Sequence, residues 1–513
     1  GALIGVAALA VDGRPVSLTM SYAEHQHFTG KRAPSYANGL LACDENGKLT
    51  AGEVEIVFDK GAYSELATGL LDAGLRFYGC PYYIPNVMGL SKGAYSNFGF
   101  STAYRGYGGP QIYTTSEQLM DMLAEKVGMD PFEFRYINAF REGDTDNWGH
   151  PFKVYPVPGI LDKLRPKYQE LLKRAKKEST PEKLRGVGVA CGSYIVGSAN
   201  DHAEVAIELN PDGSVTNYNT WEDIGQGADA GSMIFAYEAL RPLGLKPEQI
   251  HLVMNDTGTC PPTGVAGGSR SNYMAGRAII DGCEKLMNAM RKADGTYRTY
   301  DEMVQENIPT KYIGVFDNAD ETAEPDPNTS QVSKYPSSDQ TWGAYVTEVE
   351  VDVATGKVTV LAMHCVADVG TVTNYLSLDG QAYGGMEHSI GFALSEDYSD
   401  LKKHETMAGA GFTYIDMIPD GEEFTIEYNQ TERPGGPYGA GGASEVFQTS
   451  AHVAVINAIY NAAGIRIPTL PATPEKVKAA LDAKAAGKEQ PMEKYYLGGD
   501  FYETMDEIKA NPV

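Results

Sequence analysis

Polar and apolar residues alternate with a period of two in three stretches of the chain, each next to a turn that contains glycine. The clearest stretch, Glu348–Val353, places carboxylates at one set of alternate positions and valines at the other, and then turns at Ala354–Gly356. The other two stretches are Glu204–Leu209, which turns at Asn210–Gly213, and Glu53–Phe58, which follows Gly39–Thr50. Alternation of this kind beside a glycine turn predicts antiparallel hairpins with one face in solvent.

Apolar residues recur at helical spacing between these hairpins. A helix is predicted over Thr115–Gly128, where the glycine stops it. Its apolar stripe consists of Leu119, Met122, Leu123 and Val127. Asp130 followed by Pro131 predicts the start of a second helix, because an acidic cap and a first-turn proline stand in the favoured order. A further stripe predicts a helix that ends at Gly464. Hairpins mixed with helices place the chain in the α+β class.

The chain has 513 residues and is too long for a single hydrophobic core. Its composition changes after a basic, polar stretch at 173–185, from charged helical segments to glycine-rich strands. We therefore expect one domain over residues 1–178, a second over 179–483 and a C-terminal extension over 484–513. The apolar segment Gly1–Ala10 has neither an initiator Met nor a basic region, so we expect a core helix of a domain that begins before this sequence.

Acidic residues outnumber basic ones in this sequence. The 68 Asp and Glu residues and the 42 Lys and Arg residues give a formal net charge of −26. This charge argues against nucleic acid or an anionic membrane as the partner, and it suits a cytoplasmic enzyme. The sequence contains no run of about 18 apolar residues, so no transmembrane helix is predicted. Six cysteines without a C-x-x-C pair and nine histidines without metal-binding spacing predict no iron–sulfur site and no metal held by protein ligands.

The residues that could carry chemistry gather in glycine-rich segments. The most informative segment, Arg433–Glu445, ends a run of glycines in a carboxylate. A Glu in a dry site has a raised pKa and can act as a general base near neutral pH, although the segment alone also fits a surface loop with a solvated Glu. Four more segments place an amide or a guanidinium beside glycines: Ala103–Gln111, Trp221–Asp229, Gly264–Asn272 and Asp379–Gly385. Because such segments offer N–H donors to phosphates and polar heterocycles, five of them predict one large, multi-ring ligand.

These segments carry a family resemblance. The sharpest match is R-G-Y-G-G-P-Q at Arg105–Gln111, followed by D-I-G-Q-G at Asp223–Gly227, by the segment 368–385 and by the Glu that ends the glycine loop. On these residues the chain resembles the molybdenum hydroxylases related to xanthine dehydrogenase, from its start to about residue 482. It resembles in particular the prokaryotic mononuclear aldehyde oxidoreductases, through Thr29–Pro34, Gly267–Arg270 and Leu394–Asp397.

The resemblance implies a role for each matching residue. Glu445 matches the general base of the family, Tyr107 matches the aromatic residue beside the substrate, and Arg105 and Gly106 match the backbone that approaches the metal. The residues that match the cofactor-binding segments are Gly225, Gln226, Gly227, Gly267, Gly268, Ser269, Arg270 and Gln381. The implied cofactor is molybdopterin cytosine dinucleotide with molybdenum, or with tungsten. Its pterin dithiolene holds the metal, so no residue of the chain is expected to be a metal ligand. Ser444 stands where the family prefers glycine.

The activity that the resemblance implies is the oxidation of an aldehyde to a carboxylic acid with oxygen from water. The electrons are expected to pass to [2Fe-2S] clusters. The segments that bind these clusters, and the first segments that contact the metal, are not in this sequence. We therefore expect them in a partner subunit or in a longer polypeptide, with an FAD subunit as a further partner where one exists.

The substrate class stays open between aldehydes and N-heterocycles such as nicotinate or a purine. Ala73 stands where the resemblance places an Arg in purine-specific members, which favours aldehydes. Ser101–Arg105 lacks the Cys of the carbon monoxide dehydrogenases, which disfavours that activity. Leu66 and Leu70 are expected to line a substrate funnel or to pack in the core. A scaffold that has lost its chemistry is disfavoured because Glu445 is present.

Overall fold

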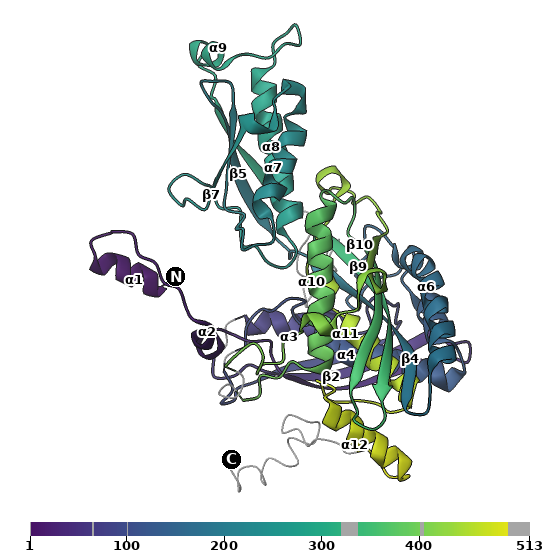
Figure 1. Ribbon diagram of the computed structural model, residues 1–513. Helices are drawn as coiled ribbons and strands as arrows, with labels where there is room; N and C mark the ends of the chain where they lie inside the picture. The colour runs from purple at the N-terminus through teal and green to yellow at the C-terminus, as the bar shows by residue number, and fades with distance from the viewer. Residues whose placement is uncertain (1, 64–65, 100, 320–336, 401–404, 491–513) are drawn as a thin grey trace.

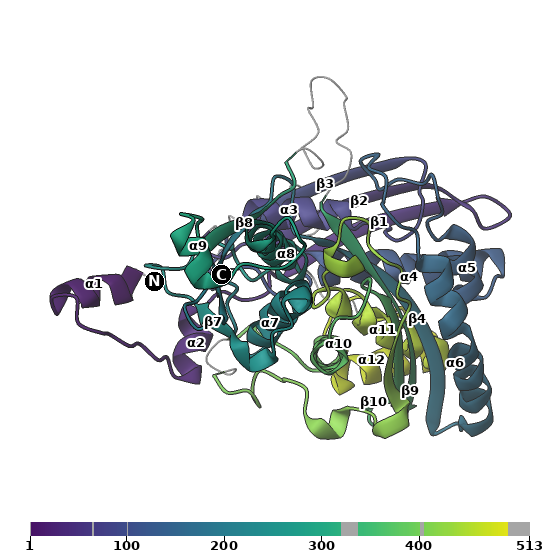
Figure 2. The same cartoon turned by 90° about the horizontal axis from the view of Figure 1, so that it is seen from above.

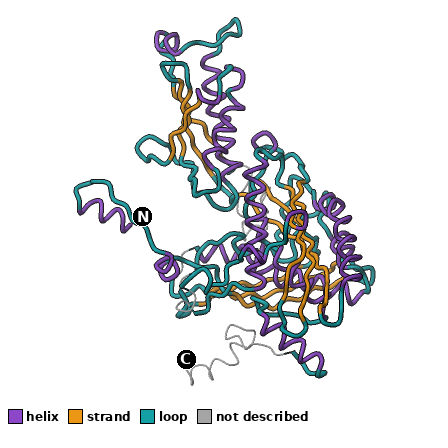
Figure 3. The backbone as a smooth tube through the Cα atoms, in the orientation of Figure 1, coloured by secondary structure: helices purple, strands orange, loops and turns teal. Residues whose placement is uncertain are grey.

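The computed structural model describes residues 2–63, 66–99, 101–319, 337–400 and 405–490. Residues 197–319 form a smaller body, which Figure 1 shows above a larger body made by most of the other described residues. Each body has its own cluster of buried apolar side chains. Figure 3 shows helices and strands interleaved in both bodies, and the sheets are of mixed direction, so the α+β prediction is confirmed.

A four-stranded sheet lies at the centre of the larger body. In spatial order, its strands are β11 (Phe424–Tyr428), β10 (Val358–Asp368), β9 (Asp339–Asp352) and β4 (Lys183–Val196). Helix α11 (Ala451–Ala463) covers one face of this sheet and α6 (Val157–Glu178) covers the other, as Figure 2 shows. The close approach of α11 requires a glycine at Gly188 of β4, because a Cβ there would overlap with the carbonyl oxygen of Ala454.

The β9–β10 hairpin forms as predicted, but the prediction that one of its faces lies in solvent is wrong. Glu348 on β9 is fully buried, because α6 covers that face. Its Oε2 lies 2.6 Å from Nε of Arg174 on α6, and its Oε1 lies 3.6 Å from Nη1 of Arg185 on β4. Glu348 therefore faces ion-pair partners instead of water.

A three-stranded sheet forms another layer of the larger body. In spatial order, its strands are β1 (Ser35–Cys43), β2 (Leu49–Asp59) and β3 (Val87–Ala94). Strands β1 and β2 form the predicted antiparallel hairpin, and β3 pairs with β2 in parallel. The helices of this region are α3 (Ala67–Arg76), α4 (Gly109–Val127) and α5 (Pro131–Asn138). The helix stop at Gly128 and the cap at Asp130 are confirmed, but α4 begins at Gly109, so the segment Arg105–Gln111 leads into its first turn.

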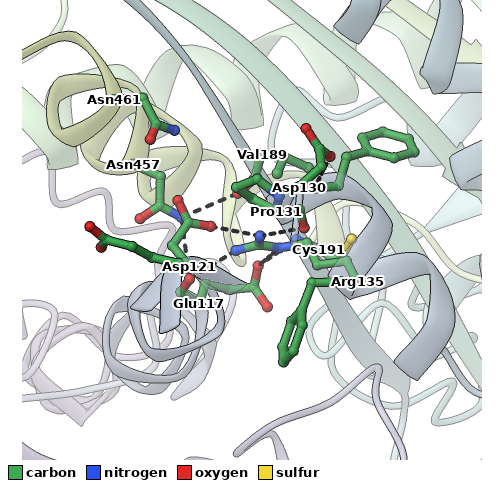
Figure 4. Close-up of polar contacts among 12 residues, drawn as sticks. Glu117, Asp121, Asp130, Pro131, Arg135, Val189, Cys191, Asn457 and Asn461 are labelled. Carbon is green, nitrogen blue, oxygen red and sulfur yellow. Dashed lines mark hydrogen bonds and ion pairs between the residues drawn. The ribbon is translucent and has the colours of Figure 1, made fainter. Parts of the chain in front are cut away.

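The most buried face of α4 carries carboxylates as well as apolar side chains and differs from the predicted apolar stripe. Met122 of that stripe is exposed, whereas Glu117 and Asp121 are buried. Both carboxylates bind Arg135 of α5, whose Nε lies 2.9 Å from Glu117 Oε2 and whose Nη1 lies 2.7 Å from Asp121 Oδ1. Glu117 also accepts a hydrogen bond of 2.9 Å from the backbone N–H of Cys191 on β4. This ion cluster ties α4, α5 and β4 together (Figure 4).

The smaller body is a second four-stranded sheet with two helices packed against it. In spatial order, its strands are β7 (Ile250–Met254), β6 (Val215–Asn219), β5 (His202–Leu209) and β8 (Lys311–Asp317). The helices are α7 (Ala228–Ala239) and α8 (Ser271–Met290), with a short α9 (Tyr300–Gln305) at the far tip (Figure 1). The predicted antiparallel hairpin is confirmed as β5–β6.

The remaining elements are one long helix, short turns of helix in both bodies and a helix near the C-terminal end. Helix α10 (Tyr375–Leu394) packs against α11 and β11, and α11 ends before Gly464 as predicted. The short turns of helix are η1 (Arg241–Leu243), η2 (Pro247–Gln249), η3 (Ile415–Met417), η4 (Gly421–Glu423), η5 (Pro437–Gly439) and η6 (Val446–Gln448). Residues 173–185, where the sequence places the domain boundary, span the end of α6 and the start of β4. Helix α12 (Pro474–Ala485) enters the predicted extension 484–513, of which residues 491–513 lie outside the described residues.

The N-terminal segment forms the predicted helix, α1 (Ala2–Ala10), but the prediction that it is a core helix is wrong for this chain. None of its residues is buried, and Leu3 and Leu9 are 72% and 81% exposed. Figures 1 and 2 show α1 apart from both bodies, joined to them through α2 (Tyr22–Phe28), so the described residues do not cover its apolar side chains. None of the described helices is long and apolar enough to cross a membrane.

Candidate functional site

A cavity of about 330 Å³ lies between the two bodies. The smaller body lines it with residues from 221–231 and 266–272, and the larger body lines it with residues from 369–381 and 441–445. The sequence-predicted residues that line it are Arg105, Gln226, Gly227, Gly267, Ser269, Arg270, Gln381 and Glu445. Gly106, Gly225 and Gly268 are their immediate neighbours in the chain. The glycine-rich segments therefore converge on one cavity.

The three predicted substrate residues lie outside the residues that line this cavity. Tyr107 follows Gly106, and its hydroxyl donates a hydrogen bond to the carbonyl of Leu66. Leu66 is 54% exposed, whereas Leu70 is 3% exposed and belongs to the core of the larger body. The structure thus joins Tyr107 to Leu66 at the start of α3 and places Leu70 beneath the surface.

Glu445 ends the glycine loop at the start of η6. Its carboxylate Oε2 accepts a hydrogen bond from the backbone N–H of Gly106. Burial raises the pKa of the Glu445 carboxyl group, while the Gly106 N–H and the guanidinium groups of Arg105 and Arg32 act in the opposite direction. A carboxyl group with a raised pKa on the wall of a cavity has the properties of a general base.

Arg105 fixes the segment that carries Glu445. Its Nε donates to the carbonyl of Ser444 at 2.7 Å, and its Nη2 donates to the carbonyl of Gln381 on α10 at 2.6 Å. The carbonyl of Arg105 in turn accepts a hydrogen bond of 2.7 Å from Nη2 of Arg32. Arg105 therefore joins the glycine loop and α10 to the turn that precedes α4.

Three helices begin at this cavity. Residues from the first turns of α7, α8 and α10 line it, and they follow Gly227, Arg270 and Asn374 respectively. Asn374 caps α10 through a hydrogen bond of 3.2 Å from the N–H of Ser377. At the start of α7, Asp223 accepts a hydrogen bond of 3.0 Å from the backbone N–H of Asp229. No side chain of the described residues caps α8. Because backbone N–H groups and the helix dipole favour anions at such ends, the cavity fits a ligand that carries phosphate.

Two of the predicted cofactor residues use their side chains within the protein. The guanidinium of Arg270 binds Asp201 through Nε at 2.9 Å, and it donates to the carbonyls of Thr263, Val265 and His202 at 3.0, 3.2 and 2.7 Å. Gln226 accepts from the N–H of Ile224 at 2.6 Å and donates to the carbonyl of Glu222 at 2.6 Å. Both side chains shape their loops, so any ligand contact of these segments falls mainly to the backbone.

Sequence reasoning missed several residues of the cavity wall, among them Asn272, Asn374 and Ser377. Asn374 lies in the segment compared with the family, and its capping role carries a signal that could have been used, since Asn is a preferred cap. Asn272 donates to the carbonyl of Gly441 at 2.7 Å, a contact across 169 positions that no local pattern indicates. Within the described residues, no three His, Cys, Asp or Glu side chains gather as a candidate metal site.

Comparisons with known proteins point in one direction. Two family models described as molybdopterin cofactor-binding domain match residues 1–139 and 163–419. The chain is 47% identical to an aldehyde oxidoreductase of Megalodesulfovibrio gigas, covering 94% of this chain and 53% of that protein. It is 27% identical to a xanthine dehydrogenase molybdenum-binding subunit of Escherichia coli, covering 91% of this chain and 64% of that protein.

Solved structures give the same picture. The chain superposes on the aldehyde oxidoreductase from Desulfovibrio desulfuricans with a TM-score of 0.89 at 48% identity, covering 93% of this chain and 52% of that one. Quinoline 2-oxidoreductase from Pseudomonas putida shares the fold, with a TM-score of 0.78 at 20% identity, covering 95% of this chain and 66% of that one. The chain thus spans about half the length of the aldehyde oxidoreductases that it resembles.

Proposed function

The chain belongs to the molybdopterin-binding domains of the xanthine oxidase family, and from this premise we propose that it is the molybdopterin-binding catalytic part of an aldehyde oxidoreductase. In the proposed reaction, an aldehyde and water give a carboxylic acid, two electrons and two protons. The observation that carries the proposal is the position of Glu445, on the wall of a cavity where helices α7, α8 and α10 begin. The 47% identity with an aldehyde oxidoreductase supports aldehydes over N-heterocycles.

We propose that the cavity holds molybdopterin cytosine dinucleotide with molybdenum. The N–H groups at the start of α8, which no side chain of the described residues caps, are suited to its diphosphate, and the backbone of Gly267–Ser269 and of Gln226–Gly227 is suited to its polar rings. Gln381 on α10 completes this set from the larger body. When bound, the cofactor supplies the two-electron oxidation of the substrate carbon.

Glu445 is proposed to accept a proton on a carboxylate oxygen as water-derived oxygen is added to the substrate carbon. Its raised pKa keeps the carboxylate basic enough for this transfer near neutral pH. Arg105 contributes by holding the neighbouring carbonyl of Ser444, and the Gly106 N–H holds the carboxylate itself. Both contacts orient the base before substrate arrives, which is how a positioned group lowers a barrier.

Tyr107 and Leu66 are proposed to flank the route by which substrate reaches Glu445. Tyr107 directly follows the residue that binds the Glu445 carboxylate, and its hydroxyl ties it to Leu66 at the start of α3. Leu70 lies beneath them in the core, where it supports this wall. Apolar and aromatic side chains in this position suit a small apolar aldehyde.

The electrons are proposed to leave through [2Fe-2S] clusters in a partner domain or subunit. This chain matches about half of the length of the aldehyde oxidoreductases, so the rest of such a protein is available to carry the clusters and the other part of the metal site. An FAD subunit is a further proposed partner where the acceptor requires one. The exposed apolar residues of α1 are suited to contact one of these partners.

The test is to purify the native complex that contains this chain and to measure its metals and its substrates together. We expect molybdenum or tungsten at about one atom per chain, and turnover of acetaldehyde or benzaldehyde well above that of nicotinate and hypoxanthine. Turnover of the heterocycles alone would move the assignment to an N-heterocycle hydroxylase. An active complex without either metal would overturn the proposal.

A further inference from the structure

One hydroxyl group of the smaller body reaches across the cavity wall to the loop of Glu445. The Oγ of Ser269 donates a hydrogen bond to the carbonyl of Ala443 at 2.6 Å. The same Oγ accepts a hydrogen bond from the backbone N–H of Glu445 at 3.3 Å. The two contacts lie on either side of Ser444, so a single side chain binds the backbone before and after that residue.

The backbone at this contact is strained on both sides. Ser444 has φ of +30° and Ser269 has φ of +58°, a backbone region that is unfavourable for residues with a Cβ and persists only where neighbours hold it. Gly442 has no room for a side chain, because a Cβ there would overlap with the carbonyl oxygen of Ser269. The two segments therefore fit against each other at backbone level, and the hydroxyl of Ser269 joins them.

Three polar backbone groups next to the Glu445 side chain are held by other residues. The carbonyl of Ala443 and the N–H of Glu445 bind Ser269, and the carbonyl of Ser444 binds Nε of Arg105 at 2.7 Å. Ser269 binds these groups from the smaller body, and Arg105 binds from the larger one. With the peptides fixed from both sides, the Cα–Cβ direction of Glu445 is fixed as well.

We infer that Ser269 is a positioning residue for Glu445, whose hydroxyl sets the direction of the Glu445 carboxylate from the far side of the cavity. The inference rests on the proposed function only in taking Glu445 as the base. It assigns the Ser269 side chain to the glycine loop of the larger body, while the backbone of the same residue stays available to the cofactor. The same short segment, Gly267–Ser269, would then both contact the ligand and align the base.

The first test needs neither cofactor nor turnover. Hydrogen exchange at the Glu445 amide is measured by mass spectrometry with site-resolving fragmentation in the unaltered protein and in Ser269→Ala. Loss of the hydrogen bond to Oγ is expected to speed exchange of that amide by roughly fivefold to tenfold. The matched control is Ser214→Ala, because Ser214 lies outside the cavity wall and its Oγ makes the same kinds of contact. It donates a hydrogen bond to Asp212 at 2.6 Å and accepts one from Asn210 at 2.9 Å. The control is expected to leave exchange at Glu445 unchanged.

Ser269→Gly separates the hydroxyl from the backbone strain. Glycine accepts φ of +58° without cost, so a fold that tolerates Ala poorly should tolerate Gly. If the hydroxyl positions Glu445, Gly and Ala speed exchange alike. If Gly keeps the slow exchange of the unaltered protein, backbone fit alone positions the loop and the inference is wrong.

The second test uses the assembled, metal-loaded enzyme at matched metal content. Both Ser269 variants are expected to lower kcat roughly tenfold with little change in KM. The acid limb of the kcat profile should also move to lower pH, because a loosened Glu445 reaches water and loses the burial that raises its pKa. An unchanged profile together with unchanged exchange would refute the positioning role. If Glu445→Gln keeps full turnover while Ser269→Ala still speeds exchange, the contact is real and the proposed base is wrong.

Discussion

Replacing Arg135 by Met removes the guanidinium that binds both carboxylates of the buried ion cluster in Figure 4. Arg135 is fully buried, and its guanidinium lies 2.9 Å from Glu117 and 2.7 Å from Asp121, which are themselves buried. The variant leaves two buried carboxyl groups without the guanidinium that binds them. Removing one partner of a buried ion pair costs about 3–5 kcal/mol, so we expect a loss of that size in the free energy of unfolding of the larger body.

The loss should depend on pH in a direction that follows from the same contacts. Burial raises the pKa of Glu117 and of Asp121, and the nearby Arg135 guanidinium lowers both. Without Arg135 the two pKa values rise further above their unfolded values. Stability in the variant is therefore highest at acid pH, where both groups are protonated, and falls as pH rises through the folded pKa values. We expect the destabilisation to be larger at pH 8 than at pH 5.

The assay is urea denaturation followed by circular dichroism at both pH values, with Arg165→Met as the control. Arg165 also faces carboxylates, Glu133 and Asp162, but its side chain is 25% exposed. Pairs of this kind contribute about 0–1 kcal/mol, so the control should change the unfolding midpoint little. Equal effects of the two substitutions, or an Arg135→Met loss that grows toward acid pH, would refute the reasoning.

Three further substitutions test other parts of the account. Burial raises the pKa of Glu396 to about 7 from 4.5, so its contribution to stability is present at acid pH and is lost as pH rises through 7. The gain in free energy of unfolding from Glu396→Gln over the unaltered chain should therefore be about 3 kcal/mol larger at pH 8 than at pH 5. Urea denaturation that gives the same difference between the two proteins at both pH values would contradict this. Gly188→Ala forces a Cβ against the carbonyl of Ala454 and should cost about 3 kcal/mol or more in thermal or urea unfolding. Gly380→Ala, which meets no atom within 4 Å, is its control, and similar behaviour of the two would be inconsistent with the packing of α11 on β4. Ser444→Gly removes the strain at φ of +30° and should raise stability by up to about 1 kcal/mol, so a lower melting temperature would count against strain at this residue.

Local patterns predicted the elements whose stability is decided within a few residues. The alternation at Glu348–Val353 indicated the β9–β10 hairpin, and Asp130 with Pro131 indicated the start of α5. The burial of Glu348 could not be predicted, because its partner Arg174 lies 174 positions away and only the assembled fold brings the two side chains together. The same holds for the parallel pairs β2–β3 and β10–β11, which join strands separated by long intervening segments.

The buried carboxylates of α4 show where a helical pattern of apolar residues gives the wrong prediction of burial. Leucines and Met122 suggested the buried side, yet Glu117 and Asp121 are more buried because Arg135 neutralises them. A carboxylate is predicted to lie on the surface unless its buried partner is known. Helical periodicity gives no information on a partner that comes from another helix.

The candidate site was more predictable than its details. The glycine-rich segments between positions 105 and 445 were predicted to share one ligand, because each carries donors that a large ligand could use. In the structure they do converge on one cavity. Their individual roles stay predictions. That the Arg270 side chain binds Asp201, and that Ser269 binds the loop of Glu445, could not be derived, since both contacts join segments that only the assembled fold brings together.

The central claim is that Glu445 acts as the base of a molybdopterin site, and one comparison tests it most directly. Turnover of an aldehyde is measured for Glu445→Gln and for the unaltered chain in the assembled enzyme, with molybdenum content matched. The control is Glu427→Gln, an exposed carboxylate on β11 outside the cavity wall. We predict that kcat falls by roughly 10²–10⁴-fold for Glu445→Gln, the contribution of a general base, and stays unchanged for the control. Full turnover by Glu445→Gln at equal metal content would contradict the account.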